Sequence, residues 1–111
     1  MKKDTQRFLR RPNDPSFLIL TSLAAGPKHG YALSKDIEEF SGAVLSPGTL
    51  YGAITRLEES GLIEPLSEVD RRHPYRLTAS GAHVLREVTL EMRRLADVGA
   101  ARLRLASGGA Q

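Results

Sequence analysis

The sequence predicts a mainly α fold with one small β-hairpin. Apolar residues recur at helical spacing in three successive segments, alternate with a period of about 2 in parts of residues 62–78, and then return to helical spacing. A length of 111 residues, with 41% apolar and 26% charged residues, is typical of a single globular domain. We therefore expect three helices, a hairpin and a long final helix.

The first helix is expected to begin at Asp14-Pro15, because an Asp side chain caps a helix well and Pro fits its first position. The segment SFLILTSLAA follows, and Gly26-Pro27 ends it. Its apolar side chains cover most of the circumference, which predicts burial in the core and at a subunit interface. These side chains are Phe17, Ile19, Leu20 and Leu23.

The second helix is expected to run from about Tyr31 to Phe40 and to end before Gly42. Leu33, Ile37 and Phe40 stand at positions i, i+4 and i+7. This spacing places them on one apolar stripe of the helix.

The third helix is expected within the segment SPGTLYGAITRLEE. Ser46 can cap it and Pro47 suits its first turn, while an apolar stripe packs on the other two helices. The stripe is formed by Leu50, Ile54 and Leu57.

The opposite face of the third helix carries two glycines, Gly48 and Gly52. Each should cost the helix roughly 0.5–1 kcal/mol relative to alanine, and an outward glycine gains nothing from the core. Either the imperfection is tolerated, or a large partner approaches the backbone closely here. We favour the second interpretation, because the neighbouring side chains can bond phosphates and base edges. These neighbours are Thr49, Tyr51, Thr55 and Arg56.

After Gly61, the segments LIEPL and PYRLT flank SEVDRRH, which predicts a two-stranded hairpin with a polar, partly basic tip. Pro65 and Pro74 indicate edge strands or frayed ends. Three helices followed by a hairpin is the order of a winged helix-turn-helix, in which the third helix enters a DNA major groove. Arg71 and Arg72 at the tip are then candidate phosphate contacts, although exposed arginines at a hairpin tip are often only solvated.

The last helix is expected to run from a Thr78 cap to about Leu105. So long a helix has little of its own domain to pack against, so we expect the same helix of a second subunit to cover it, the alternative being a fold back onto its own core. A two-fold dimer would present two third helices about one DNA turn apart, which suits a roughly palindromic site. The apolar stripe contains Leu85, Val88, Met92 and Leu95, widened by Val84, Val98 and Leu103.

The charge is concentrated at the N-terminus. Residues 1–13 carry five basic residues and one acidic residue, net +4, so the remainder of the +3 chain is close to neutral at −1. This arm can lie along a nucleic-acid backbone or remain a solvated tail. The chain has no cysteine, no signal sequence and no membrane-length apolar run, so we expect a cytoplasmic protein that does not enter a membrane.

Enzymatic chemistry is not expected. His29, His73 and His83 lie on three different predicted elements, with no paired spacing for a metal, and no glycine-rich phosphate loop follows a strand. The adjacent carboxylates Glu58 and Glu59 point about 100° apart on a helix, too far to share a proton or metal. We therefore predict neither a catalytic site, a metal nor a cofactor.

Three segments together resemble the PadR family of bacterial transcriptional regulators: GPKHGYAL, SPGTLYGAITRLEESGLI and YRLTASG. The resemblance runs from about Phe17 to Leu95. It implies a winged helix-turn-helix that dimerises through its C-terminal helix and usually represses nearby genes until a small molecule or another signal releases it. It further implies that the start of the third helix faces DNA and that Tyr31 lies near phosphates. The implied DNA-facing residues at that helix start are Ser46, Gly48, Thr49 and Tyr51.

Two features depart from the family pattern. The wing reads DRRHPYRLT in place of a glycine-arginine-rich strand with two aromatic residues, which changes the contacts expected there. A single C-terminal helix resembles the short branch of the family, so any effector is expected between subunits rather than in a separate domain. Phe8, Phe17, Met92 and Leu95 are candidates to line such a site, although core packing is the favoured role for each of them.

The predictions divide the chain into a basic arm (1–13), a winged helix-turn-helix (14–78), a dimerisation helix (79–106) and a tail (107–111). We expect a dimeric repressor that reads an operator with residues 46–60. The alternative is a dimeric adaptor that binds another protein, favoured by acidic residues near the proposed DNA face. The candidate DNA contacts are Ser46, Gly48, Thr49, Tyr51, Gly52, Thr55, Arg56, Tyr31, Lys28, Arg71 and Arg72, and the candidate dimer contacts are Phe17, Leu20, Leu85, Val88, Met92 and Leu95.

Overall fold

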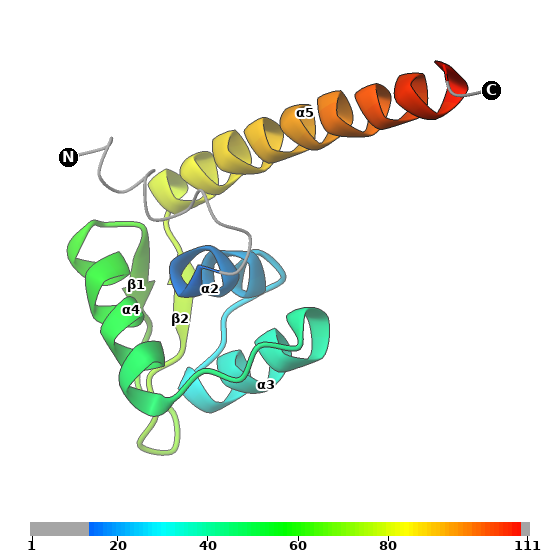
Figure 1. The fold of residues 1–111 in the computed structure, drawn as a ribbon. Coiled ribbons are helices and arrows are strands. Elements are labelled where there is room, and N and C mark those ends of the chain that lie inside the picture. The colour runs from blue at the N-terminus through cyan, green and yellow to red at the C-terminus, as the bar shows by residue number, and fades with distance from the viewer. Residues whose placement is uncertain (1–13, 110–111) are drawn as a thin grey trace.

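The structure, a computed structural model, describes residues 14–109. The element order is α2, α3, α4, β1, β2 and α5, which matches the predicted order of three helices, hairpin and long helix. The predicted basic arm 1–13 lies outside the described residues, as do residues 110–111. Figure 1 shows the three shorter helices gathered around the small sheet, with α5 extending away from them.

Helix α2, Pro15–Ala24, begins as predicted. The Asp14 side chain accepts a hydrogen bond of 2.8 Å from the Ser16 amide, which satisfies one of the unpaired N–H groups of the first turn. Most of its circumference is buried, and Ile19 and Leu20 have no exposed surface. Helix α2 is therefore the central element of the core, in contact with α3, α4, α5 and β2.

Helix α3, Gly30–Ser41, begins after His29, whose Nδ1 accepts a hydrogen bond of 3.4 Å from the Ala32 amide. It ends at Gly42 in the left-handed conformation, with φ of 77°. Leu33 and Ile37 are fully buried as predicted. The prediction is wrong for Phe40, which is 46% exposed because it lies in the last turn, beyond the reach of the core cluster.

Helix α4, Pro47–Glu59, is capped by Ser46 as predicted. The predicted stripe of Leu50, Ile54 and Leu57 is buried together with Ala53. These residues join the side chains of α2 and α3 in one apolar cluster. The remaining circumference of α4 is left for the surface.

Strands β1, Ile63–Pro65, and β2, Tyr75–Leu77, pair antiparallel, with Ile63 opposite Leu77. A hydrogen bond of 2.7 Å from the Leu66 amide to the Pro74 carbonyl continues the pairing toward the tip. On the other side of β2, the backbone groups of Tyr75 and Lys28 exchange two hydrogen bonds. The segment before α3 therefore pairs with β2 through a single antiparallel bridge.

The hairpin tip is a tight turn from Val69 to Arg72, whose amide and carbonyl groups exchange hydrogen bonds of 2.7 and 2.9 Å. The central residues Asp70 and Arg71 both have positive φ, 51° and 65°, as a type I′ turn requires. We call the segment from Leu66 to Pro74 the wing tip. The turn places Arg71 and Arg72 together at its outer end.

Helix α5, Ala79–Gly109, has 31 residues and continues past the predicted end at Leu105. Its first turn is capped by Thr78, whose Oγ1 accepts from the Gly81 amide at 3.0 Å and donates to the Gly61 carbonyl at 2.6 Å. At Gly81 the helix lies so close to the residue before β1 that an added Cβ would stand 2.0 Å from the Leu62 carbonyl oxygen. The start of α5 is therefore joined tightly to the segment that follows α4.

Within residues 14–109, the first half of α5 packs on the other elements and the second half does not, so we call the second half the free half of α5. Val88 is buried and Met92 packs partly on the core, whereas residues 93–106 are exposed except for a half-covered Ala101. A helix of 31 residues is about 46 Å long, and the described part of the molecule measures 62 × 29 × 22 Å. The wing tip and the first turn of α4 lie at the end of the molecule opposite α5 (Figure 1).

Candidate nucleic-acid interface

The two glycines of α4 face outward, as predicted. A Cβ added at Gly48 would meet nothing within 4 Å, and one added at Gly52 would meet only the Arg56 Nη1 atom at 3.5 Å. The backbone of α4 is therefore bare along one line of its solvent-facing surface, which we call the open face of α4. The predicted contact residues Thr49, Thr55 and Arg56 are all exposed beside it.

The hydroxyl groups along the open face differ in what they can still bond. Ser46 Oγ accepts from the Thr49 amide at 3.2 Å and donates to Thr49 Oγ1 at 3.0 Å, so its proton is used inside the cap. The Thr49 hydroxyl accepts in this pair and keeps its own proton for an external acceptor. Thr55 Oγ1 donates to the Tyr51 carbonyl at 2.9 Å, which leaves its lone pairs and methyl group for a partner.

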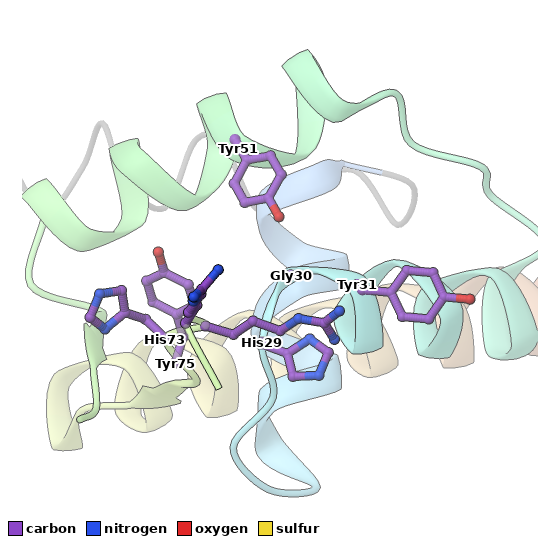
Figure 2. Close-up of a pocket in the computed structure, with 8 residues that line it drawn as sticks. His29, Gly30, Tyr31, Tyr51, His73 and Tyr75 are labelled. Atoms are coloured by element: carbon purple, nitrogen blue, oxygen red, sulfur yellow. The ribbon is translucent and has the colours of Figure 1, made fainter. Parts of the chain in front are cut away.

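Tyr51 does not lie flat on the open face. Its side chain crosses from α4 toward the start of α3, where its hydroxyl lies over Gly30 (Figure 2). The residue is 50% exposed. Tyr51 therefore links the open face of α4 to the N-terminal end of α3.

A pocket of about 420 Å³ lies between the start of α3, Tyr51 and the wing tip. It brings the predicted residues Tyr31, Tyr51, Arg71 and Arg72 together. Figure 2 shows Tyr51 and Tyr75 turned toward the space between α4 and the hairpin, while the 64% exposed Tyr31 projects to the other side. The full lining is His29, Gly30, Tyr31, Tyr51, Arg71, Arg72, His73 and Tyr75.

The pocket carries positive charge and neutral donors. Arg71 and Arg72 are exposed at the turn, and the wing-tip His73 has Nδ1 3.3 Å from the Leu66 carbonyl and Nε2 3.6 Å from a Glu68 carboxylate oxygen. Burial raises the pKa of the Tyr75 phenol above 10.0, and the negative charge of Glu58 and the neighbouring Tyr51 add to the shift. Tyr75 therefore stays protonated at neutral pH and remains a hydrogen-bond donor.

Lys28, predicted to contact DNA, has an internal role instead. Its Nζ donates to the Ser22 carbonyl at 2.6 Å and to the Gly26 carbonyl at 3.3 Å, and only 19% of its side chain is exposed. Its ammonium lies 3.9 Å from the Asp36 carboxylate, which also accepts from Ser22 Oγ at 2.6 Å. The prediction is wrong for Lys28 because the Ser22 carbonyl near the end of α2 and the Gly26 carbonyl just beyond it hold its ammonium away from the surface.

The predicted dimer residues fall into two groups. Leu20 and Val88 are buried in the core of the single chain, so their side chains have almost no surface left for a partner. This corrects their assignment to an interface. Leu95 is 55% exposed, and the others are half-buried against the core, which leaves each of them some free surface. These half-buried residues are Phe17, Leu85 and Met92.

The candidate effector residues are not brought together around a cavity. Phe17 and Met92 pack on the core, Leu95 lies on the free half of α5, and Phe8 lies outside the described residues. The pocket is lined by the start of α3, Tyr51 and residues of the hairpin, and by none of these candidates. Within residues 14–109, no group of three His, Asp or Glu residues is placed to hold a metal ion. The described helices also include none that is both long and apolar enough to cross a membrane.

Four residues that line the pocket were not among the predicted DNA contacts: His29, Gly30, His73 and Tyr75. The pair His29-Gly30 carried a signal, because a capping side chain followed by a glycine at a helix start suggests that something approaches the backbone closely. Tyr75 carried none, since its position depends on how the hairpin folds back toward α3. The pocket therefore could not be found before the hairpin was placed.

Comparison with known proteins agrees with this arrangement. The chain is 29% identical to a PadR family transcription regulator of Clostridium difficile R20291, whose crystal structure superposes with a TM-score of 0.72 over 80% of this chain and 97% of that one. An uncharacterised 37.1 kDa protein in transposon TN4556 of Streptomyces fradiae is 47% identical over 85 residues, which cover 77% of this chain and 25% of that protein. The transcriptional activator GvpE2 of Halobacterium salinarum is 34% identical over 71 residues, which cover 64% of this chain and 36% of that protein.

The chain thus matches only a minor part of the length of these two relatives. The sequence model of the PadR-like family of transcriptional regulators matches residues 19–87, from the middle of α2 into α5. That range contains α3, the open face of α4, and the wing. The chain therefore belongs to the PadR-like family of transcriptional regulators.

Proposed function

We propose that the protein binds double-stranded DNA as a homodimer and regulates transcription by reading an operator with α4. The observation that carries the proposal is the open face of α4, where Gly48 and Gly52 leave the helix backbone bare beside exposed hydroxyl and guanidinium groups. A major groove admits one α-helix, and a bare face allows the helix to sit deeper in it. Thr49, Thr55 and Arg56 are then the side chains closest to base edges.

The pocket beside the wing tip is proposed to receive the DNA backbone that borders the groove. Arg71 and Arg72 supply positive charge, and the hydroxyl groups of Tyr51 and Tyr75 supply neutral donors. Phosphate contacts of this kind fix the register of a protein on the duplex, while base contacts provide the specificity. The wing and α4 would thus act on adjacent parts of one duplex.

The free half of α5 supports the dimer. Leu95 and Leu103 are 55% and 72% exposed on a helix that projects beyond the core. A second α5 packed along this stripe would remove both side chains from water. A two-fold axis there would place two copies of α4 on one side of a duplex, as a roughly palindromic operator requires.

We propose repression as the regulatory outcome, with release by a signal that the chain itself does not specify. The related GvpE2 is named a transcriptional activator, so whether this protein lowers or raises transcription needs its own measurement. A reporter gene placed behind the operator in cells with and without the protein gives it directly. Lower expression in the presence of the protein supports repression, and higher expression shows activation.

The DNA proposal is tested by fluorescence anisotropy with a duplex selected from a random-sequence pool and a shuffled duplex of the same composition. We expect tight binding of the selected duplex and a steep fall of affinity with salt. The double variant Arg71→Ala/Arg72→Ala should lower the salt slope by about 2, because each lost phosphate contact removes about 0.9.

The matched control is Arg86→Ala/Arg104→Ala, which removes the same charge from exposed positions of α5. Its salt slope should stay close to that of the wild type. Equal, weak binding of both duplexes by the wild-type protein would contradict the proposal. That result would favour the alternative of a winged-helix adaptor that binds another protein.

A further inference from the structure

Gly30 is the first residue of α3, and it is buried beneath the side chain of Tyr51 from α4. A Cβ built on Gly30 would stand 2.3 Å from the Tyr51 hydroxyl oxygen, 2.8 Å from Cζ and 3.0 Å from Cε1. Contacts this short do not occur between real atoms, so any larger residue at position 30 must push the phenol ring aside. Figure 2 shows the ring of Tyr51 directed at this point of α3.

The backbone of Gly30 gives no other reason for a glycine. Among the described residues, the glycines with positive φ are Gly26, Gly42 and Gly61, and Gly30 is not one of them. An L-residue can therefore adopt its conformation, and alanine would favour a helix more than glycine does. What position 30 requires is empty space, and the side chain that occupies this space is Tyr51.

We propose that Gly30 is a positioning residue for DNA binding: its missing side chain allows Tyr51 to lie across the start of α3 and to present its hydroxyl to the DNA backbone beside the wing. The inference rests on the proposed DNA-binding function and assigns a role within it. It separates Tyr51 from the base-reading side chains of the open face, because its ring leaves that face to reach the pocket. Tyr51 then contributes affinity that is largely independent of sequence.

The displaced ring can move without unfolding the protein. Tyr51 as a residue is 50% exposed, and the atoms in conflict are at the far end of a side chain that can rotate into solvent. Gly30→Ala should therefore fold normally while moving the hydroxyl away from its place over α3. This separates the positioning role of Gly30 from a role in stability.

The test is a double-mutant cycle measured by fluorescence anisotropy on the selected duplex, with Gly30→Ala, Tyr51→Ala and the double variant. A hydrogen bond to a charged group is worth roughly 1.5–3 kcal/mol, so Tyr51→Ala should weaken binding about tenfold or more. Gly30→Ala should cause a similar loss in the wild-type background. It should cause almost none when Tyr51 is already alanine, since the side chain through which it acts is gone.

Two further readouts make the outcome specific. Tyr51 is uncharged, so the salt slope of Gly30→Ala should equal that of the wild type, and the loss should be the same on the shuffled duplex. In the wild-type protein, nuclear Overhauser contacts are expected between the ring protons of Tyr51 and the α-protons of Gly30. This measurement needs no variant and remains decisive if Gly30→Ala fails to fold.

Wild-type affinity for Gly30→Ala would overturn the proposal, and so would an equal loss in the Tyr51→Ala background, because the new methyl group would then act on DNA directly. Absence of the Overhauser contacts in a folded wild-type protein would remove its geometric basis. A wild-type protein that binds neither duplex would contradict the proposed function instead, which keeps the two failures distinct.

Discussion

Replacing Gly52 tests the open face of α4 most directly, because the structure gives opposite expectations for stability and for DNA binding. A Cβ at Gly52 meets only Arg56 Nη1 at an ordinary contact distance of 3.5 Å, so Gly52→Ala fits the folded chain without strain. Alanine is favoured over glycine in a helix by about 0.8–1 kcal/mol. For a domain of this size, that gain corresponds to a rise in Tm of roughly 3–8 °C.

The expectation for DNA binding has the opposite sign. If the backbone at Gly52 approaches the groove, the added methyl group should weaken specific binding by roughly 1–3 kcal/mol, the usual cost of inserting atoms into a packed contact. Gly52→Leu should hold α4 out of the groove altogether. Its affinity for the selected duplex should then fall to the level of the shuffled one, a loss of about 10³-fold or more.

The assay pairs thermal unfolding followed by circular dichroism with fluorescence anisotropy on both duplexes. Gly52→Ala and Gly52→Leu form a graded pair that shares the gain in helix propensity and differs in how far the side chain projects. A fall in Tm for the alanine variant would show that Gly52 packs inside the protein. Unchanged discrimination between the duplexes in Gly52→Leu would show that DNA does not approach α4 on this face.

Three other predictions concern the core, the dimer and alkaline pH. Lys28→Met should lower the free energy of unfolding, measured with urea, by about 2 kcal/mol, because it removes the charged hydrogen bonds to the Ser22 and Gly26 carbonyls. The salt slope of DNA binding should stay unchanged. A lower salt slope would show that Lys28 contacts DNA after all. The double variant Leu95→Asp/Leu103→Asp should be a folded monomer in analytical ultracentrifugation, because it places charges on the exposed stripe of α5. The control Leu90→Asp, about 140° from Leu95 around the helix, should leave the dimer intact. If the double variant remains a dimer, the interface lies on another surface. The pKa of Tyr75 is higher in the folded than in the unfolded chain, so the folded state binds more protons above pH 10.0, and the free energy of unfolding should decline as the pH rises past that value. Tyr75→Phe should reduce this decline. An identical alkaline stability profile in the variant would show that Tyr75 does not cause it.

The secondary structure could be predicted because its signals are local. Asp14, Ser46 and Thr78 each cap a helix through their own side chains, and the apolar stripes of α3 and α4 follow from spacing within one segment. The outward direction of Gly48 and Gly52 follows from the same helical phase. These parts of the fold depend on residues close together in the chain.

The errors arise where contacts join distant segments. Lys28 looks like a surface cation in sequence, and only the fold brings it to the open end of α2 and near Asp36. Phe40 and Val88 continue helical stripes, but whether a stripe is covered depends on where the neighbouring helices end. The Tyr51–Gly30 contact needs α3 and α4 in place before it exists. Half of the candidate site is thus set by tertiary packing, which helical phase alone does not describe.

The close contacts at Gly81 fix the start of α5 against the segment that follows α4, so the angle of the whole helix depends on this junction. Thr78 bonds to the Gly61 carbonyl, and Gly81 leaves no room for a side chain against Leu62, so we expect a substitution at either point to tilt α5. Over a helix of about 46 Å, a tilt of only 10° displaces the far end by roughly 8 Å. In a dimer joined through α5, the spacing between the two DNA-reading helices would therefore be adjusted at this junction, and a small shift there would be enough to bring both copies of α4 into or out of register with the duplex.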